Sequence, residues 1–342
     1  MTPRFAFVFP GQGSQSVGMG ADVAEQSPAA RATFDEADEA LGFPLSELCF
    51  NGPEERLRET VNTQPAIVAT SLALLAALDE AAETVRIAIS PAFLAGHSVG
   101  EYTALAASGG CGTPEALRLV RERGRLMHEE GLRIPSGMTA VLGLDAPTLE
   151  DICAEATRET EIALGDAAYV HPGAGKVVVA NDNAPGQIVI SGAERALALA
   201  GDMAKARGAK RIIPLAVSGA FHSPVMAPAS EAMAAVLTTA TLVDPTVTLI
   251  ANSTAGPLTT AADLRKELSR QIASPVRWTT TIEYLVDRGV TLFVEVGPGQ
   301  VLAGLIRRIN KDARTVSVGS YAEIEPALEA LAKLIRDERG ES

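Results

Sequence analysis

Residues 92–107 read AFLAGHSVGEYTALAA, and this stretch decides the fold expected for the whole chain. A short apolar run, Phe93 to Ala95, leads into a GxSxG, and a helix-like stretch from Glu101 to Ala107 follows. Glycines on both sides of the serine permit a strained strand-to-helix turn that projects the hydroxyl outward and points the next amide at a developing oxyanion. The context predicts a nucleophile elbow in an α/β protein, with Ser98 as the nucleophile.

A serine nucleophile needs a base, and the chain holds only four histidines. They are His97, His128, His171 and His222. His97 adjoins the serine, but neighbouring residues in an elbow point in different directions, so we expect it to pack or hydrogen-bond. His222 follows a predicted strand, gains backbone freedom from Gly219 and is restrained by Pro224. It is the best candidate for a general base, although a lone loop histidine is more often structural.

Away from the elbow, short apolar strands such as Phe5 to Phe9 and Ala92 to Ala95 alternate with alanine-rich helices. This order predicts a parallel α/β sheet. The rhythm changes in the middle of the chain to a βαββαβ order, which is the ferredoxin-like arrangement. Its expected elements are strand 138–144, helix 148–157, strands 176–180 and 187–191, helix 194–206 and strand 211–216. We therefore predict a large domain of residues 1–134 and 218–342 with a small domain, 135–217, inserted in it.

Composition narrows the classes of function. The chain has 342 residues, 47% of them hydrophobic, and a formal net charge of −13, which disfavours nucleic acid as a partner. Three cysteines without a CxxC pair, no metal-ligand cluster and no secretory signal in residues 1–10 predict a cytoplasmic protein without a bound metal. The uncharged run Thr60 to Leu78 contains seven polar or proline residues, so we expect a buried helix starting near Pro65 and no membrane span.

Several motifs together resemble the malonyl-CoA:acyl carrier protein transacylase family and occur in that family's order. They are FPGQGSQ at 9–15, TQPA at 63–66, GHSVGEY at 96–102, RG at 123–124, GAFHSP at 219–224, SPVRW at 274–278 and VGPG at 296–299. The resemblance implies an α/β-hydrolase-like large domain carrying a ferredoxin-like insertion. It also implies malonyl-CoA and holo acyl carrier protein as substrate and partner, fatty-acid synthesis as the pathway, and no cofactor. The stretch 159–175 is longer than usual for the family.

The resemblance assigns the chemical steps to particular positions. Ser98 matches the acylated serine, His222 the general base, and Gln271 the residue whose backbone carbonyl orients that histidine. The amides of Val99 and Gln12 match the oxyanion hole. The residues alone favour other interpretations for some of these positions, since Gln271 reads as a helix-surface amide. The pair Gly11 and Gly13 reads weakly as a dinucleotide loop, which Ser16 in place of a third glycine disfavours.

Substrate-binding positions follow from the same resemblance. Arg123 matches the arginine that pairs with the free carboxylate of malonate, although Arg118, Arg121 and Arg125 around it read as a solvated helix face. Phe221 before the base resembles the version that selects malonyl over methylmalonyl. Asn181 and Asn183 resemble a small-domain loop that faces the cleft and lines the pantetheine channel.

Two basic clusters are candidates for docking an acidic carrier protein: 205–211, KARGAKR, and Arg307, Arg308 and Lys311. Ordinary solvated side chains would read the same way. Three other functions share the sequence features. A serine hydrolase or thioesterase would use the same elbow and base, a stand-alone polyketide acyltransferase would carry the same motifs, and a catalytically silent carrier-binding module would lack chemistry altogether.

Overall fold

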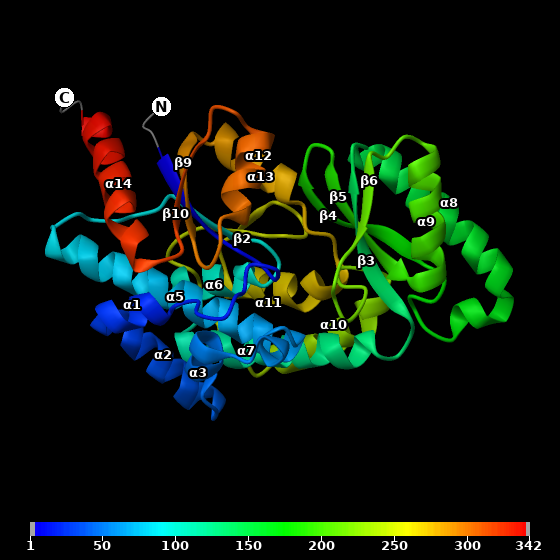
Figure 1. Cartoon of the computed structure of the whole chain (residues 1–342), viewed down its shortest axis with the longest axis horizontal. Coiled ribbons are helices and arrows are strands. Elements are labelled where there is room, and N and C mark those ends of the chain that lie inside the picture. The colour runs from blue at the N-terminus through cyan, green and yellow to red at the C-terminus, as the bar shows by residue number, and fades with distance from the viewer. Residues whose placement is uncertain (1–3, 340–342) are drawn as a thin grey trace.

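A six-stranded sheet forms the frame of the larger part of the molecule, and the computed structural model describes residues 4–339 (Figure 1). The strand order is β10-β9-β1-β2-β7-β8, with all neighbours parallel except the last pair. The strands are β1 (Arg4–Phe9), β2 (Phe93–Gly96), β7 (Leu249–Ile250), β8 (Pro257–Leu258), β9 (Val290–Val296) and β10 (Arg314–Val318). The predicted parallel α/β sheet is confirmed, with an antiparallel edge strand added.

Alternation along β1 shows why this sheet is buried on both faces. Phe5, Phe7 and Phe9 pack into one hydrophobic cluster, whereas Ala6 and Val8 pack into another on the opposite face. The helices of this part are α1 (Ala21–Gln26), α2 (Pro28–Leu41), α3 (Leu45–Asn51), α4 (Glu54–Leu57), α5 (Thr60–Thr84), α6 (Gly100–Ala107), α7 (Thr113–Gly131), α10 (Ala227–Leu237), α11 (Ala261–Arg270), α12 (Trp278–Asp287), α13 (Val301–Ile309) and α14 (Ile324–Arg339). Three 3₁₀ turns join them: η2 (Pro224–Met226), η3 (Gln271–Ala273) and η4 (Tyr321–Glu323).

Helix α5 corrects one expectation. It begins at Thr60, not near Pro65, and the proline lies inside it. Side chains before the proline stabilise this start, because Thr63 donates to Leu57 O (2.5 Å) and Asn62 to Arg56 O (3.0 Å). Among the described residues, α5 is the one helix long and apolar enough to cross a membrane, but 72% of its most apolar window is buried. The prediction of a buried core helix is confirmed.

A second sheet forms the right-hand part of Figure 1 and is antiparallel throughout. Its strand order is β4-β5-β3-β6, and helices α8 and α9 pack on it around Val141, Ile152 and Ile190. The elements follow the order β3 (Ser136–Leu142), α8 (Ala146–Leu164), η1 (Gly165–Tyr169), β4 (Val177–Ala184), β5 (Gln187–Ala193), α9 (Glu194–Ala206) and β6 (Arg211–Pro214). The predicted sequence of elements is therefore observed, although α8 runs on to Leu164 and absorbs the start of the long stretch 159–175.

Strand β4 joins the two parts. Val276 N donates to Ala180 O (2.8 Å) and Asp182 N donates to Val276 O (3.0 Å), so the segment after η3 pairs with β4 like a short extra strand. In the segment between η1 and β4, the buried His171 contacts Glu130 of α7, with 2.6 Å between Nε2 and Oε1. The second sheet is thus attached to elements that also carry residues of the site.

Candidate active site

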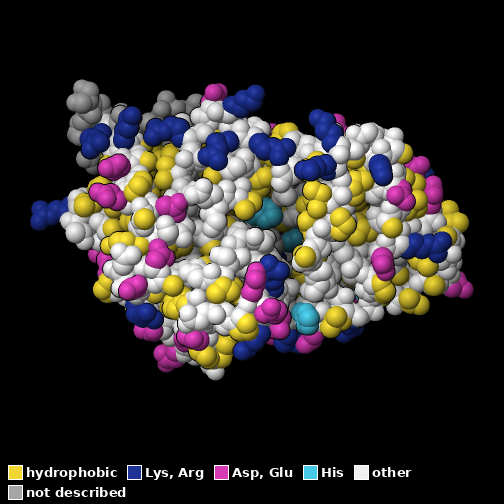
Figure 2. Space-filling view, viewed as in Figure 1, with side chains coloured by type: hydrophobic (Ala, Val, Ile, Leu, Met, Phe, Trp, Pro, Cys, Tyr) yellow, Lys and Arg dark blue, Asp and Glu magenta, His cyan; other side chains and the backbone are white. Residues whose placement is uncertain are grey.

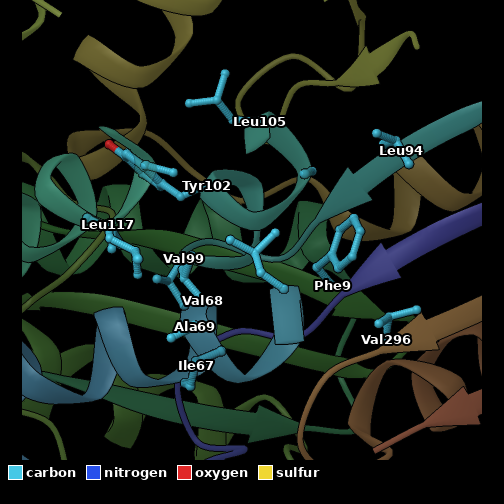
Figure 3. Close-up of a cluster of buried hydrophobic side chains, with 14 of the residues drawn as sticks. Phe9, Ile67, Val68, Ala69, Leu94, Val99, Tyr102, Leu105, Leu117 and Val296 are labelled. Carbon is cyan, nitrogen blue, oxygen red and sulfur yellow. The ribbon is translucent and has the colours of Figure 1, made fainter. Parts of the chain in front are cut away.

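The predicted strand–turn–helix around Ser98 is confirmed. Strand β2 ends at Gly96, α6 begins at Gly100, and Ser98 between them has a φ of 51°, the strained value of a nucleophile elbow. Close packing explains the two glycines, since a Cβ on Gly96 would lie 2.0 Å from Gly100 O and one on Gly100 would lie 2.2 Å from Phe9 O. Figure 3 shows Val99, the residue after the nucleophile, among buried side chains that include Phe9 and Val68.

Asn252, just after β7, stabilises the elbow by hydrogen bonds to its backbone. Its Oδ1 accepts from Ser98 N (2.7 Å) and its Nδ2 donates to Gly96 O (2.6 Å), while its own backbone amide donates to the carboxylate of Glu101 (3.0 Å). Ser98 N is therefore occupied, and the next amide in the chain is that of Val99, the N-cap residue of α6. No local sequence pattern indicates this role of Asn252, because its contacts depend on the pairing of β2 with β7.

His222 lies directly against the serine, with 2.7 Å between Nε2 and Ser98 Oγ. Its Nδ1 lies 3.0 Å from both Gln271 O and Ser274 O, and two carbonyl acceptors require a proton on Nδ1. Nε2 is then the unprotonated atom that faces the hydroxyl. Burial, followed by the charge of Arg123, lowers the pKa of His222 to about 3, so the imidazole is neutral near pH 7.

Arg123 of α7 is 1% exposed, so the solvated helix face that its arginine neighbours indicated is wrong for this residue. Nη2 lies 3.1 Å from Ser98 Oγ, Nη1 donates to Gln64 Oε1 (2.7 Å), and Nε donates to Gln271 Oε1 (3.2 Å). Gln271 is also fully buried, which contradicts its interpretation as a surface amide. Every one of these partners is neutral, so the guanidinium points an unneutralised charge at the serine.

The first loop of the chain closes the other side of the elbow. His97 N donates to Phe9 O (3.0 Å), and a Cβ on Gly11 would lie 2.6 Å from His97 O, so glycine is required for this approach. A cavity of about 170 Å³ opens here. It is lined by 11–14 of the loop, His97, Asn183 and Gln187 of the second sheet, and Val301, Leu302 and Leu305 of α13. Figure 2 shows histidine surface within the hollow between the two parts of the molecule.

The two predicted asparagines separate in the structure. Asn183 lines the cavity, and its Oδ1 lies 2.7 Å from His97 Nε2, as expected for a hydrogen-bonding His97. Asn181 is buried at the bridge between β4 and Val276. The loop expected over residues 181–186 is shorter than predicted, because residues 181–184 complete β4 and only Pro185 and Gly186 form the turn. Phe221 is buried beside His222.

Comparison with known proteins identifies the family of this chain. A model of the acyl transferase domain family matches residues 6–340. The chain belongs to the acyl transferase domain family. It is 43% identical to the malonyl CoA-acyl carrier protein transacylase of Bacillus subtilis over 96% of this chain and 97% of that protein, and 40% identical to that of Haemophilus influenzae over 96% and 99%.

Solved structures support the assignment of this chain to the acyl transferase family. The acyl-carrier-protein S-malonyltransferase of Bartonella henselae matches with a TM-score of 0.87 and 40% identity, covering 96% of this chain and 99% of that one. A malonyl-transacylase solved in complex with a type II polyketide synthase acyl carrier protein matches with a TM-score of 0.87 and 38% identity, over 96% and 99%.

Four residues of this acyl transferase site were missed at the level of sequence: Gln64, Glu101, Asn252 and Ser274, whose carbonyl accepts from His222 Nδ1. The first two lie inside motifs that carried the resemblance, TQPA and GHSVGEY, so their presence was visible and their contacts were not. Glu101 is fully buried in the first turn of α6 and accepts from Gln271 Nε2. Burial, and then the nearby Glu267, raise the pKa of Glu101 well above its usual range.

Proposed function

We propose that this acyl transferase moves malonyl from malonyl-CoA to the phosphopantetheine thiol of holo acyl carrier protein through a Ser98 ester. One observation carries the proposal: Ser98 Oγ lies 2.7 Å from a neutral histidine nitrogen and 3.1 Å from a buried guanidinium. The first contact activates a nucleophile, and the second places a cation where the free carboxylate of a malonyl thioester would lie. Relatives named malonyl CoA-acyl carrier protein transacylase match this chain over nearly their full length, and they support the same substrate.

Acylation begins when Ser98 Oγ attacks the thioester carbonyl and its proton moves to His222 Nε2. The C–S bond then breaks, and the imidazolium returns the proton to the sulfur of coenzyme A. Nδ1 stays bound to the carbonyls of Gln271 and Ser274, which hold the ring while it is charged. A neutral carbonyl in place of a carboxylate keeps a full negative charge away from an anionic substrate. The second half reaction reverses these steps with the pantetheine thiol as nucleophile.

The oxyanion formed in each half reaction would be bound by the amides of Val99 and Gln12. Val99 is the N-cap residue of α6, so its amide lies at the helix N-terminus, where the helix dipole also favours negative charge. Gln12 borders the cavity in a loop that Gly11 packs against His97. Donors fixed in this way commonly contribute roughly 3 to 4 kcal/mol each to lowering the barrier.

Arg123 gives the selectivity for a dicarboxylic acyl group. An acetyl group would leave the buried guanidinium unpaired, at a cost of roughly 3 to 5 kcal/mol, which is about a hundredfold or more in preference. The buried Phe221 next to the base would restrict the space for a methyl branch, which supports discrimination of about 1 to 3 kcal/mol. Asn183 at the cavity wall would face the pantetheine arm, whereas the position of Asn181 in the β4 bridge suits a structural role.

We further propose the domain assignment and cellular setting that the family resemblance implies. Residues 1–134 and 218–342 form an α/β-hydrolase-like catalytic domain, and 135–217 form a ferredoxin-like insertion, which the order β4-β5-β3-β6 supports. The reaction uses side chains and backbone amides alone, with no cofactor or metal. Fatty-acid synthesis in the cytoplasm fits this chemistry. Supply of a polyketide carrier is the second candidate, favoured by the matching complex with a type II polyketide synthase carrier protein.

The carrier protein would dock on basic residues beside the cavity. Arg308 of α13 reaches the β4–β5 turn, where Nη2 donates to Pro185 O (3.2 Å) and Nη1 contacts the side chain of Gln187. Lys210 lies against Gly143 at the end of β3. Both side chains would meet an acidic partner, and rim charges of this kind act chiefly on the rate of association.

The direct test is intact mass after brief exposure to malonyl-CoA, run beside Ser98→Ala and His222→Ala. The proposal predicts one malonyl adduct on the wild-type protein, none on Ser98→Ala, and slow acylation of His222→Ala. Absence of an adduct on the wild-type protein would leave a silent carrier-binding module as the better description. An adduct that persists on Ser98→Ala would place the nucleophile elsewhere.

A further inference from the structure

The side chain of Gln271 lies in the centre of the buried cluster behind Ser98. Its Oε1 accepts from both Nε (3.2 Å) and Nη2 (2.8 Å) of Arg123, and its Nε2 donates to Ser98 O (2.9 Å) and to the carboxylate of Glu101. A guanidinium only donates, and a backbone carbonyl only accepts. Both ends therefore require the same orientation, and the amide oxygen is fixed against Arg123.

The neutrality of that oxygen determines how much charge Arg123 can offer a substrate. Among the side chains described, those of residues 4–336, no carboxylate lies within ion-pair distance of its guanidinium. The acidic group nearest in the network, Glu101, faces the far end of the Gln271 amide, and its burial favours the protonated form. The amide thus solvates the buried cation without neutralising it.

We infer that the side chain of Gln271 is a specificity determinant: its neutral amide accepts from Arg123 without neutralising it, and so keeps the positive charge free for the carboxylate of the acyl group. This inference rests on the proposed function and adds to it, because the role given to Gln271 above is that of its backbone carbonyl, which accepts from His222 Nδ1. One residue would then serve two ends of the site, the carbonyl orienting the base and the side chain setting the charge that selects the substrate.

Two substitutions distinguish a negative charge at this position from the loss of the amide donor to Ser98 O. Gln271→Glu keeps the size and puts a carboxylate on Arg123, so an internal ion pair competes with the substrate carboxylate. Gln271→Met keeps the length without a charge. Both leave the backbone carbonyl in the chain, so both retain the acceptor for His222 Nδ1. Their comparison therefore reports on the charge beside Arg123.

The measurement is the acylation of Ser98 by malonyl-CoA and, separately, by acetyl-CoA, followed by intact mass and expressed as the ratio of the two second-order rate constants. We expect Gln271→Glu to lower the malonyl-to-acetyl ratio about tenfold or more, and Gln271→Met to stay within about threefold of wild type. A destabilised fold would lower both rate constants together and leave the ratio unchanged. Gln64→Glu, which places a carboxylate on Nη1 of the same guanidinium from α5, repeats the test if Gln271→Glu does not fold, and the same fall is expected.

Two results would overturn the inference: a ratio unchanged by the glutamate variants, or an equal loss of the ratio in Gln271→Met, which would assign selectivity to the shape of the amide. Failure of the proposed function looks different, because wild-type Ser98 would then not be acylated by malonyl-CoA at all.

Discussion

Asn252→Ala is expected to disable the elbow while leaving substrate binding in place. The change removes the acceptor for Ser98 N and the donor to Gly96 O, two bonds of 2.7 and 2.6 Å made by a buried side chain. Each backbone group left unpaired in a buried site costs about 1 to 3 kcal/mol. The lost bonds also help to hold the φ of 51° at Ser98, a backbone conformation that stores about 1 to 3 kcal/mol.

We therefore expect the free energy of unfolding to fall by about 2 to 4 kcal/mol, because one of the two bonds is only partly buried. A hydroxyl displaced by about 1 Å from its base loses about a hundredfold in rate, so acylation at saturating malonyl-CoA should fall by that order. The Michaelis constant should change little, since Arg123 keeps its contacts with Gln64 and Gln271.

The assay combines denaturant unfolding with the rate of adduct formation per folded molecule. Ser27→Ala is a matched control, because Ser27 is also buried, makes two hydrogen bonds at the start of α2 and makes none to the elbow. It should lose about 1 kcal/mol of stability and keep the wild-type rate. Wild-type acylation by the folded fraction of Asn252→Ala would refute the clamp.

Three further perturbations test other parts of the account. Arg123→Ala should raise the pKa of His222 from about 3 toward 6.5, because it removes the arginine charge, the second cause of the lowered pKa after burial. On acidification, acylation by acetyl-CoA should then fall at a higher pH than in wild type, and a pH–rate profile measures this difference. Glu295, which accepts two amides at the start of α13, has a pKa raised by burial from 4.5 to about 7. The folded state thus binds the proton of Glu295 more tightly than the unfolded state does. The free energy of unfolding should therefore fall by on the order of 3 kcal/mol as pH rises from 4.5 to about 7. Denaturant titrations at both ends of this pH range should show that Glu295→Gln removes the fall. Lys210→Glu and Arg308→Glu should raise the Michaelis constant for the carrier protein, most at low salt, and no change at low ionic strength would exclude these residues from docking.

Local patterns were enough to predict the sheet, the elbow and the order of the inserted elements. The apolar strand before Gly96, the glycines around Ser98 and the helix after it are consecutive in the chain, so their geometry follows from neighbouring residues. Positions that depend on distant segments were harder. Arg123 lies among arginines that read as a solvated face, and only the packing of α7 against α5 shows that it is buried.

The contacts of Asn252 with Ser98 and of Gln271 with Arg123 join segments more than a hundred residues apart. Asn252 reaches Ser98 because β7 pairs with β2, and Gln271 reaches Arg123 because η3 follows α11 into the core. The start of α5 was missed for a different reason, since the hydrogen bonds of Asn62 and Thr63 to the preceding turn outweigh the proline signal at 65. The family resemblance supplied roles for several of these residues that periodicity alone did not.

The fate of the malonyl group on Ser98 distinguishes a transferase from a hydrolase. Isolated malonyl-enzyme would be mixed with holo acyl carrier protein in a single turnover, quenched at intervals, and the malonyl group followed into carrier and into free malonate. Transfer to the carrier thiol that is faster than hydrolysis is the result predicted for a transferase whose buried Arg123 holds the acyl group. Release as free malonate with the carrier unmodified would contradict the account and identify a hydrolase on the same fold.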